Sequence, residues 1–387
     1  MTMEAKALLP VKIGDGELTA SNVAAATEDA WADDVLYAAG AFVEGPDHRI
    51  YRAVRGFKAS AVVTLVADTP FTFTWGDHGL VGGDPVFLNT PGTLPSPLIA
   101  DTAYFAIVVD PNTFRIADSP GGSAISAAGG AGVGDITAYG PANLGQSLTD
   151  EFWWEDNGPA NRWAMFDLLS SVQTENAGSI EFTLEHGTMV SAIALLNLVG
   201  ASEVTIVATS VLGGGEVYND TYDLTEPAFI SGFWSWFFTP LRYKRKFYVD
   251  DIRPFSDLIV TITISGPGTV KCGLCLTGLP LDIGEVERGA EAGLKSYSER
   301  TFDNFGNLVS NVVRRSANVV RTRLLCMNKR AAALTSLFDD WRDVPVLWLF
   351  SDRFESLVVF GFYQSFTYLF EHNEQGAYSL QIDGLSN

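Results

Sequence analysis

The chain has 387 residues, a length that favours two to four domains over a single hydrophobic core. Hydrophobic residues make up 47% of it and charged residues 18%, which is a globular composition and excludes a largely disordered chain. The net charge of −21 argues against a nucleic-acid partner, because contacts to phosphates need a basic surface.

The first segment, residues 1–59, combines aromatic residues with turn signals. Alternation around Ala41–Val43 and Ile50–Val54 predicts two short strands, joined by the turn GPDH at 45–48. Residues 141–157 return to the same aromatic character after an interruption. We therefore expect these two segments to form one small module, of a carbohydrate-binding-like kind.

Residues 60–140 interrupt that module with a different composition. The expected strands are VVTLV (62–66), FTFTW (71–75), YFAIVV (104–109) and FRIA (114–117). The piece from Ser119 to Gly134 is small and rich in Gly, as in a loop. The pattern predicts a small β-domain inserted between the two halves of the aromatic module.

Residues 158–285 give a series of strands with β-branched or alternating residues. They are IEFTL (180–184), VSAIALLNL (190–198), EVTIVAT (203–209), LIVTITI (258–264) and TVKCGLCL (269–276). The SGPG sequence at 265–268 predicts a hairpin between the last two strands. So many short strands indicate an antiparallel β-sandwich of the jelly-roll or galactose-binding-like type.

Residues 286–387 mix helix and strand signals. In residues 328–341, an apolar stripe predicts one amphipathic helix, with Asn328 as a possible N-cap. The stripe consists of Leu334, Leu337, Phe338 and Trp341. Strands are expected at 344–350, 356–363 and 377–385, which makes this an α+β domain. The whole chain is thus predicted to be mainly β and multi-domain.

Candidate metal and redox residues are few. Cys272 and Cys275 have the spacing of half a zinc ribbon or a redox pair, but no second pair accompanies them and Cys326 is alone. We expect no metal site and no cofactor. An odd, low number of cysteines also indicates a chain that folds in a reducing cytoplasm.

Catalytic motifs are also weak. The four histidines, His48, His78, His186 and His372, stand in different segments and form no HxxxH or HExxH pattern. Acidic doublets such as Asp33-Asp34 are poor glycosidase pairs, because neighbouring residues of a strand point to opposite faces. We expect no catalytic residues and a protein that is not an enzyme.

The aromatic residues give the strongest binding signal. Trp31, Tyr37, Trp153 and Trp154, next to Phe152, offer apolar faces that stack on sugar rings. The alternative is that they form the core of a module too small for an ordinary one. A second group, Trp234, Trp236, Phe237 and Phe238, alternates in an expected strand and suggests an intersubunit contact.

Two basic stretches interrupt an acidic chain. The first contains Arg242, Lys244, Arg245 and Lys246, and the second contains Arg314, Arg315, Arg321, Arg323, Lys329 and Arg330. Such patches suit charge-complementary assembly between copies or neighbours, although solvated faces explain them equally well. The first residues lack the pattern of a signal peptide, and no apolar run has the length of a membrane span. We therefore expect a soluble chain that is not exported by the usual route.

Three resemblances follow from these motifs. Trp31, Tyr37, Gly40, Phe42-Val43 and Tyr51, completed by Trp153-Trp154, resemble the small chitin-binding-type modules of secreted glycosidases. Residues 69–125, with GDHGLVGGDPV, LPSPL and NTFRI, are similar to a β-domain that recurs in phage tail and fibre proteins. From GPANRWAMFD (158–167) through GPGTVKCGLCLTG and SYSERTFDNFGN to QIDGL, the chain resembles a structural family of long-tailed phage tails.

These resemblances imply a virion protein without catalytic residues, made in the host cytoplasm and placed in the phage tail. The function expected is that of an oligomeric tail-tip or baseplate component, which contacts copies of itself and neighbouring tail proteins. Host polysaccharide is a further candidate partner, for adsorption. A receptor-binding, lectin-like tail fibre protein is the first alternative. An enzyme that degrades host polysaccharide is the second, and it needs a carboxylate pair that the sequence does not single out.

Overall fold

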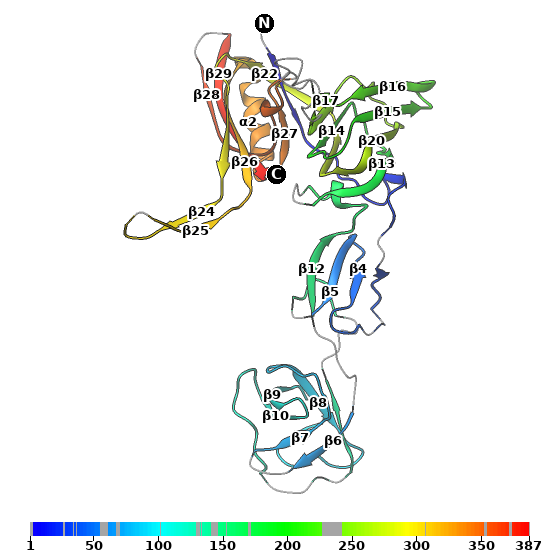
Figure 1. Ribbon diagram of the computed structural model, residues 1–387, viewed down its shortest axis with the longest axis vertical. Helices are drawn as coiled ribbons and strands as arrows, with labels where there is room; N and C mark the ends of the chain where they lie inside the picture. The colour runs from blue at the N-terminus through cyan, green and yellow to red at the C-terminus, as the bar shows by residue number, and fades with distance from the viewer. Residues whose placement is uncertain are drawn as a thin grey trace. The chain divides into compact units, whose positions relative to one another are not determined.

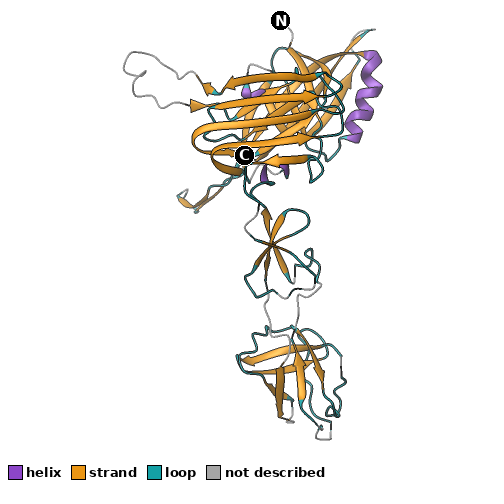
Figure 2. Ribbon diagram, turned by 90° about the vertical axis from the view of Figure 1, so that its right-hand side faces the viewer, coloured by secondary structure: helices purple, strands orange, loops and turns teal. Residues whose placement is uncertain are grey.

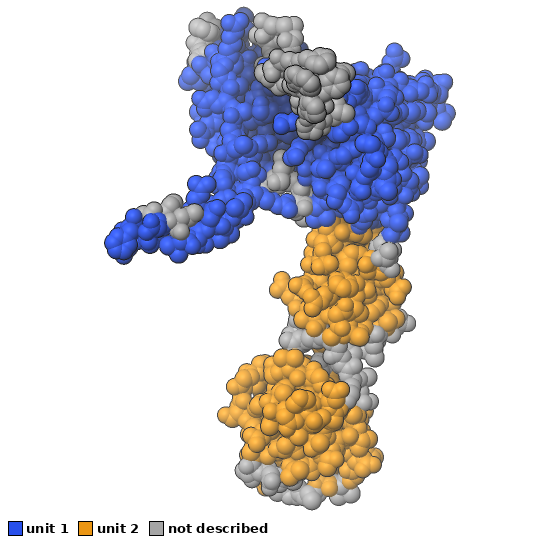
Figure 3. Space-filling model, in the orientation of Figure 1, with its two compact units in different colours: residues 1–25, 161–387 blue, residues 26–160 orange. Residues whose placement is uncertain are grey.

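The structure is a computed structural model. It describes residues 3–25, 28–33, 35, 37–54, 61–66, 70–100, 102–128, 132, 134–140, 146–151, 153–168, 172–226, 242–305, 307–351, 354–370 and 374–386. The chain divides into two compact units (Figure 3): unit 1 contains residues 1–25 and 161–387, and unit 2 contains residues 26–160. Nearly all regular structure is antiparallel strand, which confirms the mainly-β, multi-domain prediction.

Unit 1 contains the predicted β-sandwich. One sheet has the order β16 (Gly215–Asp223), β15 (Glu203–Ser210), β20 (Ile259–Cys272), β13 (Thr174–Glu185) and β2 (Leu18–Ser21). The other has the order β19 (Lys246–Val249), β14 (Ala192–Leu196) and β21 (Leu274–Gly278). Alternating residues such as Ile180, Ile193, Ile206 and Ile262 form the core between them. The 3₁₀ helix η1 (Ala164–Phe166) and the pair β17 (Thr225–Glu226) and β18 (Arg242–Tyr243) complete this part.

The hairpin predicted at SGPG is wrong. Strand β20 runs unbroken from Ile259 to Cys272 and pairs along its length with β13. The register between β13 and β20 shifts between Ala177 and Ser179, opposite the SGPG sequence. The glycines therefore lie at an irregularity within one strand and not at a turn. A side chain at Gly266 would collide with the carbonyl oxygen of Gly200, which explains why this position lacks one. The chain passes from this sheet to the other sheet of the sandwich at Gly273, between β20 and β21.

The last third of unit 1 is a strongly curved sheet. Its order is β22 (Pro280–Val286), β1 (Met3–Leu8), β27 (Val346–Leu349), β28 (Val358–Leu369), β29 (Gln375–Ser386), β26 (Ser316–Met327) and β23 (Glu291–Ser296). Because β22 also pairs with β26, six of these strands close on themselves and β23 remains as an added edge strand. An apolar layer joins the sheet to the sandwich, with Leu8, Ala194, Leu276, Leu347 and Phe360 as members.

Strands β1 and β2 correct one expected boundary. Residues 1–59 are expected together in the aromatic module, whereas residues 1–25 lie in unit 1. Strand β1 pairs with β22 and β27, and β2 pairs with β13. Ala5 and Ala7, fully buried in this sheet, are too small to mark a strand by alternation of large apolar residues. Strand β22, expected in the sandwich, likewise belongs to the curved sheet.

The predicted amphipathic helix is confirmed as α2 (Ala331–Asp340), which lies against the strands of unit 1 (Figure 2). Leu334 and Phe338 are buried, and the Phe338 ring stacks on Trp348 and on Phe366, with ring centroids 5.8 and 4.5 Å away. The cap predicted at Asn328 is wrong. Asn328 begins the 3₁₀ helix η2 (Asn328–Arg330), and its side-chain oxygen accepts from the Tyr368 hydroxyl at 3.2 Å. A second 3₁₀ helix, η3 (Glu355–Leu357), precedes β28.

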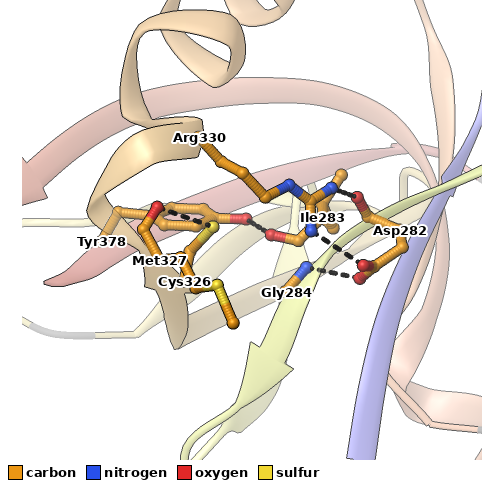
Figure 4. Close-up of polar contacts among 7 residues, drawn as sticks. All are labelled: Asp282, Ile283, Gly284, Cys326, Met327, Arg330 and Tyr378. Carbon is orange, nitrogen blue, oxygen red and sulfur yellow. Dashed lines mark hydrogen bonds and ion pairs between the residues drawn. The ribbon is translucent and has the colours of Figure 1, made fainter. Parts of the chain in front are cut away.

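A small set of polar contacts holds β22 in the curved sheet (Figure 4). Arg330 donates to the carboxylate of Asp282 at 2.8 Å and also to its carbonyl oxygen, and the Tyr378 hydroxyl donates to the carbonyl of Ile283. Gly284 has a φ of +131°, and a Cβ there would meet the carbonyl oxygen of Leu325 at 2.6 Å. Side chains from η2 and from β29 therefore hold β22, in addition to its backbone pairing with β1 and β26.

Unit 2 contains a closed six-stranded barrel (Figure 1). Around the barrel the order is β10 (Thr113–Ala117), β7 (Thr72–Thr74), β6 (Ala61–Val66), β11 (Ile136–Tyr139), β8 (Pro85–Asn89) and β9 (Tyr104–Asp110). Four of these strands match the sequence prediction, and β8 and β11 are additional. Phe71, Phe73, Phe114 and Ile116 are fully buried inside, so this barrel has a core of its own.

The remainder of unit 2 is a four-stranded sheet with the order β12 (Trp154–Pro159), β5 (Arg49–Ala53), β4 (Phe42–Glu44) and β3 (Asp29–Ala30). The pair β4 and β5 matches the prediction for this segment. Strands β5 and β12, separated in sequence by the barrel, are hydrogen-bonded neighbours. The backbone N–H of Val54 donates to the carbonyl of Trp153 at 2.9 Å, so the chain leaves and returns at adjacent points of this sheet.

Candidate functional site

The four predicted carbohydrate-binding residues all lie in this small sheet and the loops beside it. Trp153 and Trp154 are buried, with exposed fractions of 6% and 1%, among Val43, Tyr51 and Ala53. Trp154 opens β12 and pairs with Ala53 of β5, so its ring points to the same face as Val43. These two indoles therefore form the core of the sheet, which was the alternative interpretation of the aromatic pattern.

Trp31 and Tyr37 lie at the border of that core. Both side chains are half-buried, and the Tyr37 ring meets Trp154 edge-on, with ring centroids 5.5 Å apart. The Tyr37 hydroxyl accepts from the backbone N–H of Ala32 at 2.7 Å, which fixes the loop between β3 and β4. The indole nitrogen of Trp31 is buried and has no hydrogen-bond partner among the described residues. The structure thus brings all four residues together and leaves only Trp31 and Tyr37 with partly exposed rings.

The outer face of the same sheet carries an aromatic residue that the sequence analysis did not single out as a site. Phe42 of β4 is 45% exposed and pairs with Arg52 of β5, which in turn pairs with Glu155 of β12. Arg52 and Glu155 form an ion pair at 3.3 Å. Since Phe42 neighbours the buried Val43, strict alternation along β4 was the signal that could have identified its outward direction. An exposed ring beside a charged pair is suited to stacking on a polar ring such as a sugar.

Tyr51 is buried on the inner face of the small sheet and is held there by a hydrogen bond. Its hydroxyl donates to the carboxylate of Asp47 at 2.7 Å within the predicted 45–48 turn. Burial and this hydrogen bond raise the pKa of Tyr51 to about 12. Beside it, Arg49 and Asp156 form an ion pair at 2.8 Å across β5 and β12. The inner face is therefore a packed and hydrogen-bonded core.

His78, one of the four histidines considered as catalytic residues, is buried and hydrogen-bonded to backbone groups. It is 2% exposed, and its Nδ1 accepts from the backbone N–H of Leu80 at 2.9 Å. With Nδ1 an acceptor, Nε2 carries the proton and donates to the carbonyl of Asp110 at 2.9 Å. Asp84, also buried, accepts from the N–H of Val81 at 2.8 Å. The His and Asp of the GDHGL and GGDP motifs thus hold turns of the barrel.

The other histidines differ from one another. His48 lies 3.5 Å from Glu44 at the β4–β5 turn. His186 is buried after β13, and neither ring nitrogen has a hydrogen-bond partner among the described residues. Burial lowers the pKa of His186, while the nearby Glu17 carboxylate opposes this shift. His372 lies outside the described residues.

The cysteines do not gather into a site. Cys272 ends β20, Cys275 lies in β21, and both are buried with free thiols. Burial raises the pKa of Cys272 to about 12 and also raises that of Cys275, so neither thiol is a nucleophile at neutral pH. Cys326 is a third buried, free thiol. In the described part of the chain, no group of three or more metal-ligating side chains is found.

A hollow in the described surface of unit 1 lies over β23, β26 and β29 and has a volume of about 660 Å³. Its lining combines apolar residues with charged and polar side chains, among them Glu291, Lys295, Arg321, Gln381 and Asp383. Lys295 and Asp383 are 3.3 Å apart, and Arg321 donates to the Gln381 side chain at 3.0 Å. This is a shallow surface of mutually paired groups at the edge of the curved sheet. The predicted contact residues Trp234, Trp236, Phe237 and Phe238, and also Phe152, lie outside the described residues.

Comparison with known proteins gives no match: no family model, no curated protein and no solved structure is similar to this chain. Among the described residues, no helix is both long enough and apolar enough to cross a membrane.

Proposed function

We propose that this protein is a non-catalytic structural component of a long-tailed phage tail, placed at the tail tip or baseplate, where it assembles with copies of itself and with neighbouring tail proteins. The proposal depends first on the motifs of residues 69–125 and 158–385, which resemble tail and fibre proteins. The architecture agrees with it, because separate β-cores with open strand edges are typical of chains that complete their surfaces in an assembly.

One observation of the described chain carries the assembly part of the proposal. Between β23 and β26 the chain forms β24 (Glu299–Phe302) and β25 (Leu308–Val312), a hairpin that pairs with no other described strand. At its tip Phe305 is 90% exposed, and Val313 at its base is 78% exposed. An isolated two-stranded hairpin is marginally stable in water, and exposed apolar residues on it favour a protein partner.

Immunogold electron microscopy of virions from the source phage tests the tail assignment, with antibody raised against the recombinant chain. Gold clustered at the tail tip is the expected result. Gold along the fibres would instead favour the lectin-like alternative. Protein that occurs only in the lysate and never on virions would refute the tail assignment and reopen the enzyme hypothesis.

A receptor-binding role is the second candidate, and the exposed Phe42 beside Arg52 and Glu155 favours it. In this case the small sheet of unit 2 binds a host polysaccharide through the outer face of β4 and β5, on which Phe42 and Arg52 lie. The buried Trp153 and Trp154 support that face from below.

Glycan-array binding separates this candidate from simple assembly. If the outer face binds sugar, Phe42→Ala abolishes the signal while the melting temperature stays close to that of the parent. The matched control is Phe87→Ala, which removes a similarly exposed ring from the barrel in the same unit. Equal binding by both variants, or no binding by the parent protein, would rule out the Phe42 face as a receptor site.

A further inference from the structure

The β24–β25 hairpin is the outer half of a longer ribbon. The inner half is β23 paired with β26, from Glu291 opposite Arg321 to Ser296 opposite Ser316. The ladder continues through the N–H of Tyr297, which donates to the carbonyl of Arg315 at 3.2 Å, and then through β24 and β25. We call residues 294–315 the arm. The inner half lies on the curved sheet, whereas β24 and β25 extend away from the rest of unit 1 (Figures 1 and 3).

The arm exposes apolar side chains that its own hairpin cannot cover. They are Leu294, Tyr297, Phe305, Val309, Val312 and Val313, with exposed fractions between 44% and 90%. Soluble monomers rarely expose so many large apolar residues on one short segment. In addition, β23 pairs on one side only among the described strands, so its other edge presents free backbone groups. The arm therefore has both apolar area and an open strand edge.

The arm is also basic in an acidic protein. Residues 294–315 contain four basic and two acidic residues, whereas the whole chain carries a net charge of −21. Arg314 is paired with Glu299 of the same hairpin, at 3.0 Å. Such a segment is attracted to acidic surfaces, and acidic residues outnumber basic ones in this chain by 46 to 25.

A surface with complementary charge and exposed apolar residues lies at the β16 edge of the sandwich. The β15–β16 hairpin and its continuation, residues 203–226, contain five acidic and no basic residues. Strand β16 is an edge strand that pairs only with β15 among the described strands, and Glu216, Asp220 and Asp223 on it are exposed. At the hairpin tip, Val211 is 90% exposed and Leu212 is 71% exposed. This hairpin thus offers an acidic open edge that ends in an apolar tip.

The arm and the β16 edge lie on opposite sides of unit 1 (Figure 1), so the arm does not reach the β16 edge of its own chain. We propose that the arm of one copy docks on the β16 edge of a second copy, by charge pairing and by covering apolar residues at both sites. This inference rests on the proposed function, for which it names the self-assembly surfaces. Two different patches meet in this contact, so it is head-to-tail and builds a ring or a filament.

Charge reversal with complementation tests the proposal, using sedimentation velocity of the full chain at low salt. The arm variant is Arg300→Glu with Arg315→Glu, and the edge variant is Glu216→Lys with Asp220→Lys. Each alone should weaken self-association about tenfold or more, because like charges then face each other. A mixture of the two should associate again, since the acidic arm of the first variant then meets the introduced lysines of the second, and the basic arm of the second meets the unchanged acidic edge of the first.

The control variant is Arg288→Glu with Arg342→Glu, which makes the same charge change as the arm variant at exposed positions outside the arm. It should associate like the parent protein. A parent chain that stays monomeric at its highest soluble concentration would overturn the inference, as would arm and edge variants that still associate normally. Immunogold labelling of virions is independent of this result. A protein that is found in the tail but assembles through another surface would refute only this inference. A protein that is absent from virions would refute the proposed function.

Discussion

The hydroxyl of Tyr378 gives the sharpest test of how the curved sheet is held together. It donates to the carbonyl of Ile283, and the ring is 1% exposed in the core between β29 and β22. Burial raises the pKa of this hydroxyl well above its usual value, so it stays protonated and a donor at any ordinary pH. Tyr378→Phe removes the donor but keeps the ring and its aromatic contacts.

The expected cost is about 1–3 kcal/mol of the free energy of unfolding, because the Ile283 carbonyl is left buried without this partner. Tyr368→Phe is a matched control from the neighbouring strand β28. Its hydroxyl is half-buried and donates over longer distances, 3.2 Å to Asn328 and 3.4 Å to the carbonyl of Cys326, so about 0.5 kcal/mol or less is expected. Urea unfolding followed by tryptophan fluorescence measures both. Equal losses of unfolding free energy in the two variants would refute the argument that burial of the Tyr378–Ile283 hydrogen bond determines its contribution to stability.

Three further predictions follow from the cores of the two units. Phe338→Ala should cost about 3–5 kcal/mol of stability, whereas Phe305→Ala at the exposed arm tip should change it by about 0.5 kcal/mol at most, by urea unfolding. Because burial lowers the pKa of His186 from 6.5, the unfolded chain binds the proton more readily, and stability should fall as the pH drops below 6.5, by at most about 1.4 kcal/mol per pH unit. His186→Phe should flatten that slope, and an unchanged slope would show that other groups produce it. Replacing residues 61–139 with a short Gly-Ser linker should leave the calorimetric transition of unit 1 in place, because the barrel core lies entirely between Val63 and Ala138.

Local patterns predicted the parts of this fold that local physics determines. Alternation of apolar residues located β6, β9 and β10, and the spacing of Leu334, Phe338 and Trp341 located α2, because one buried face imposes its period on the sequence. The turn at residues 45–48 followed from its Gly and Pro. In each case the information lies within about a dozen neighbouring residues.

Signals with two physical meanings were harder to resolve. The Gly-Pro-Gly of residues 266–268 serves a hairpin or a strand irregularity equally well, and only the partner strand β13 decides between them. Trp153 and Trp154 are suited to sugar stacking or to a core, and the decision depends on residues of β4 and β5, about a hundred positions earlier. The exposed Phe42 shows the same limit, since its surroundings are set by pairing across three strands.

Strand β1 is the clearest case of structure that no local pattern contains, and it has a consequence for folding. It lies between β22 and β27, so residues 3–8 complete a sheet whose other strands come from the last third of the chain. Leu8 also packs against the sandwich residues Ala194 and Leu276. Unit 2 is continuous in sequence, whereas unit 1 closes only after β27, β28 and β29 are available. Because long-range pairing is slow and domains fold as units, unit 2 should fold first during synthesis, while β1 waits for the strands that flank it.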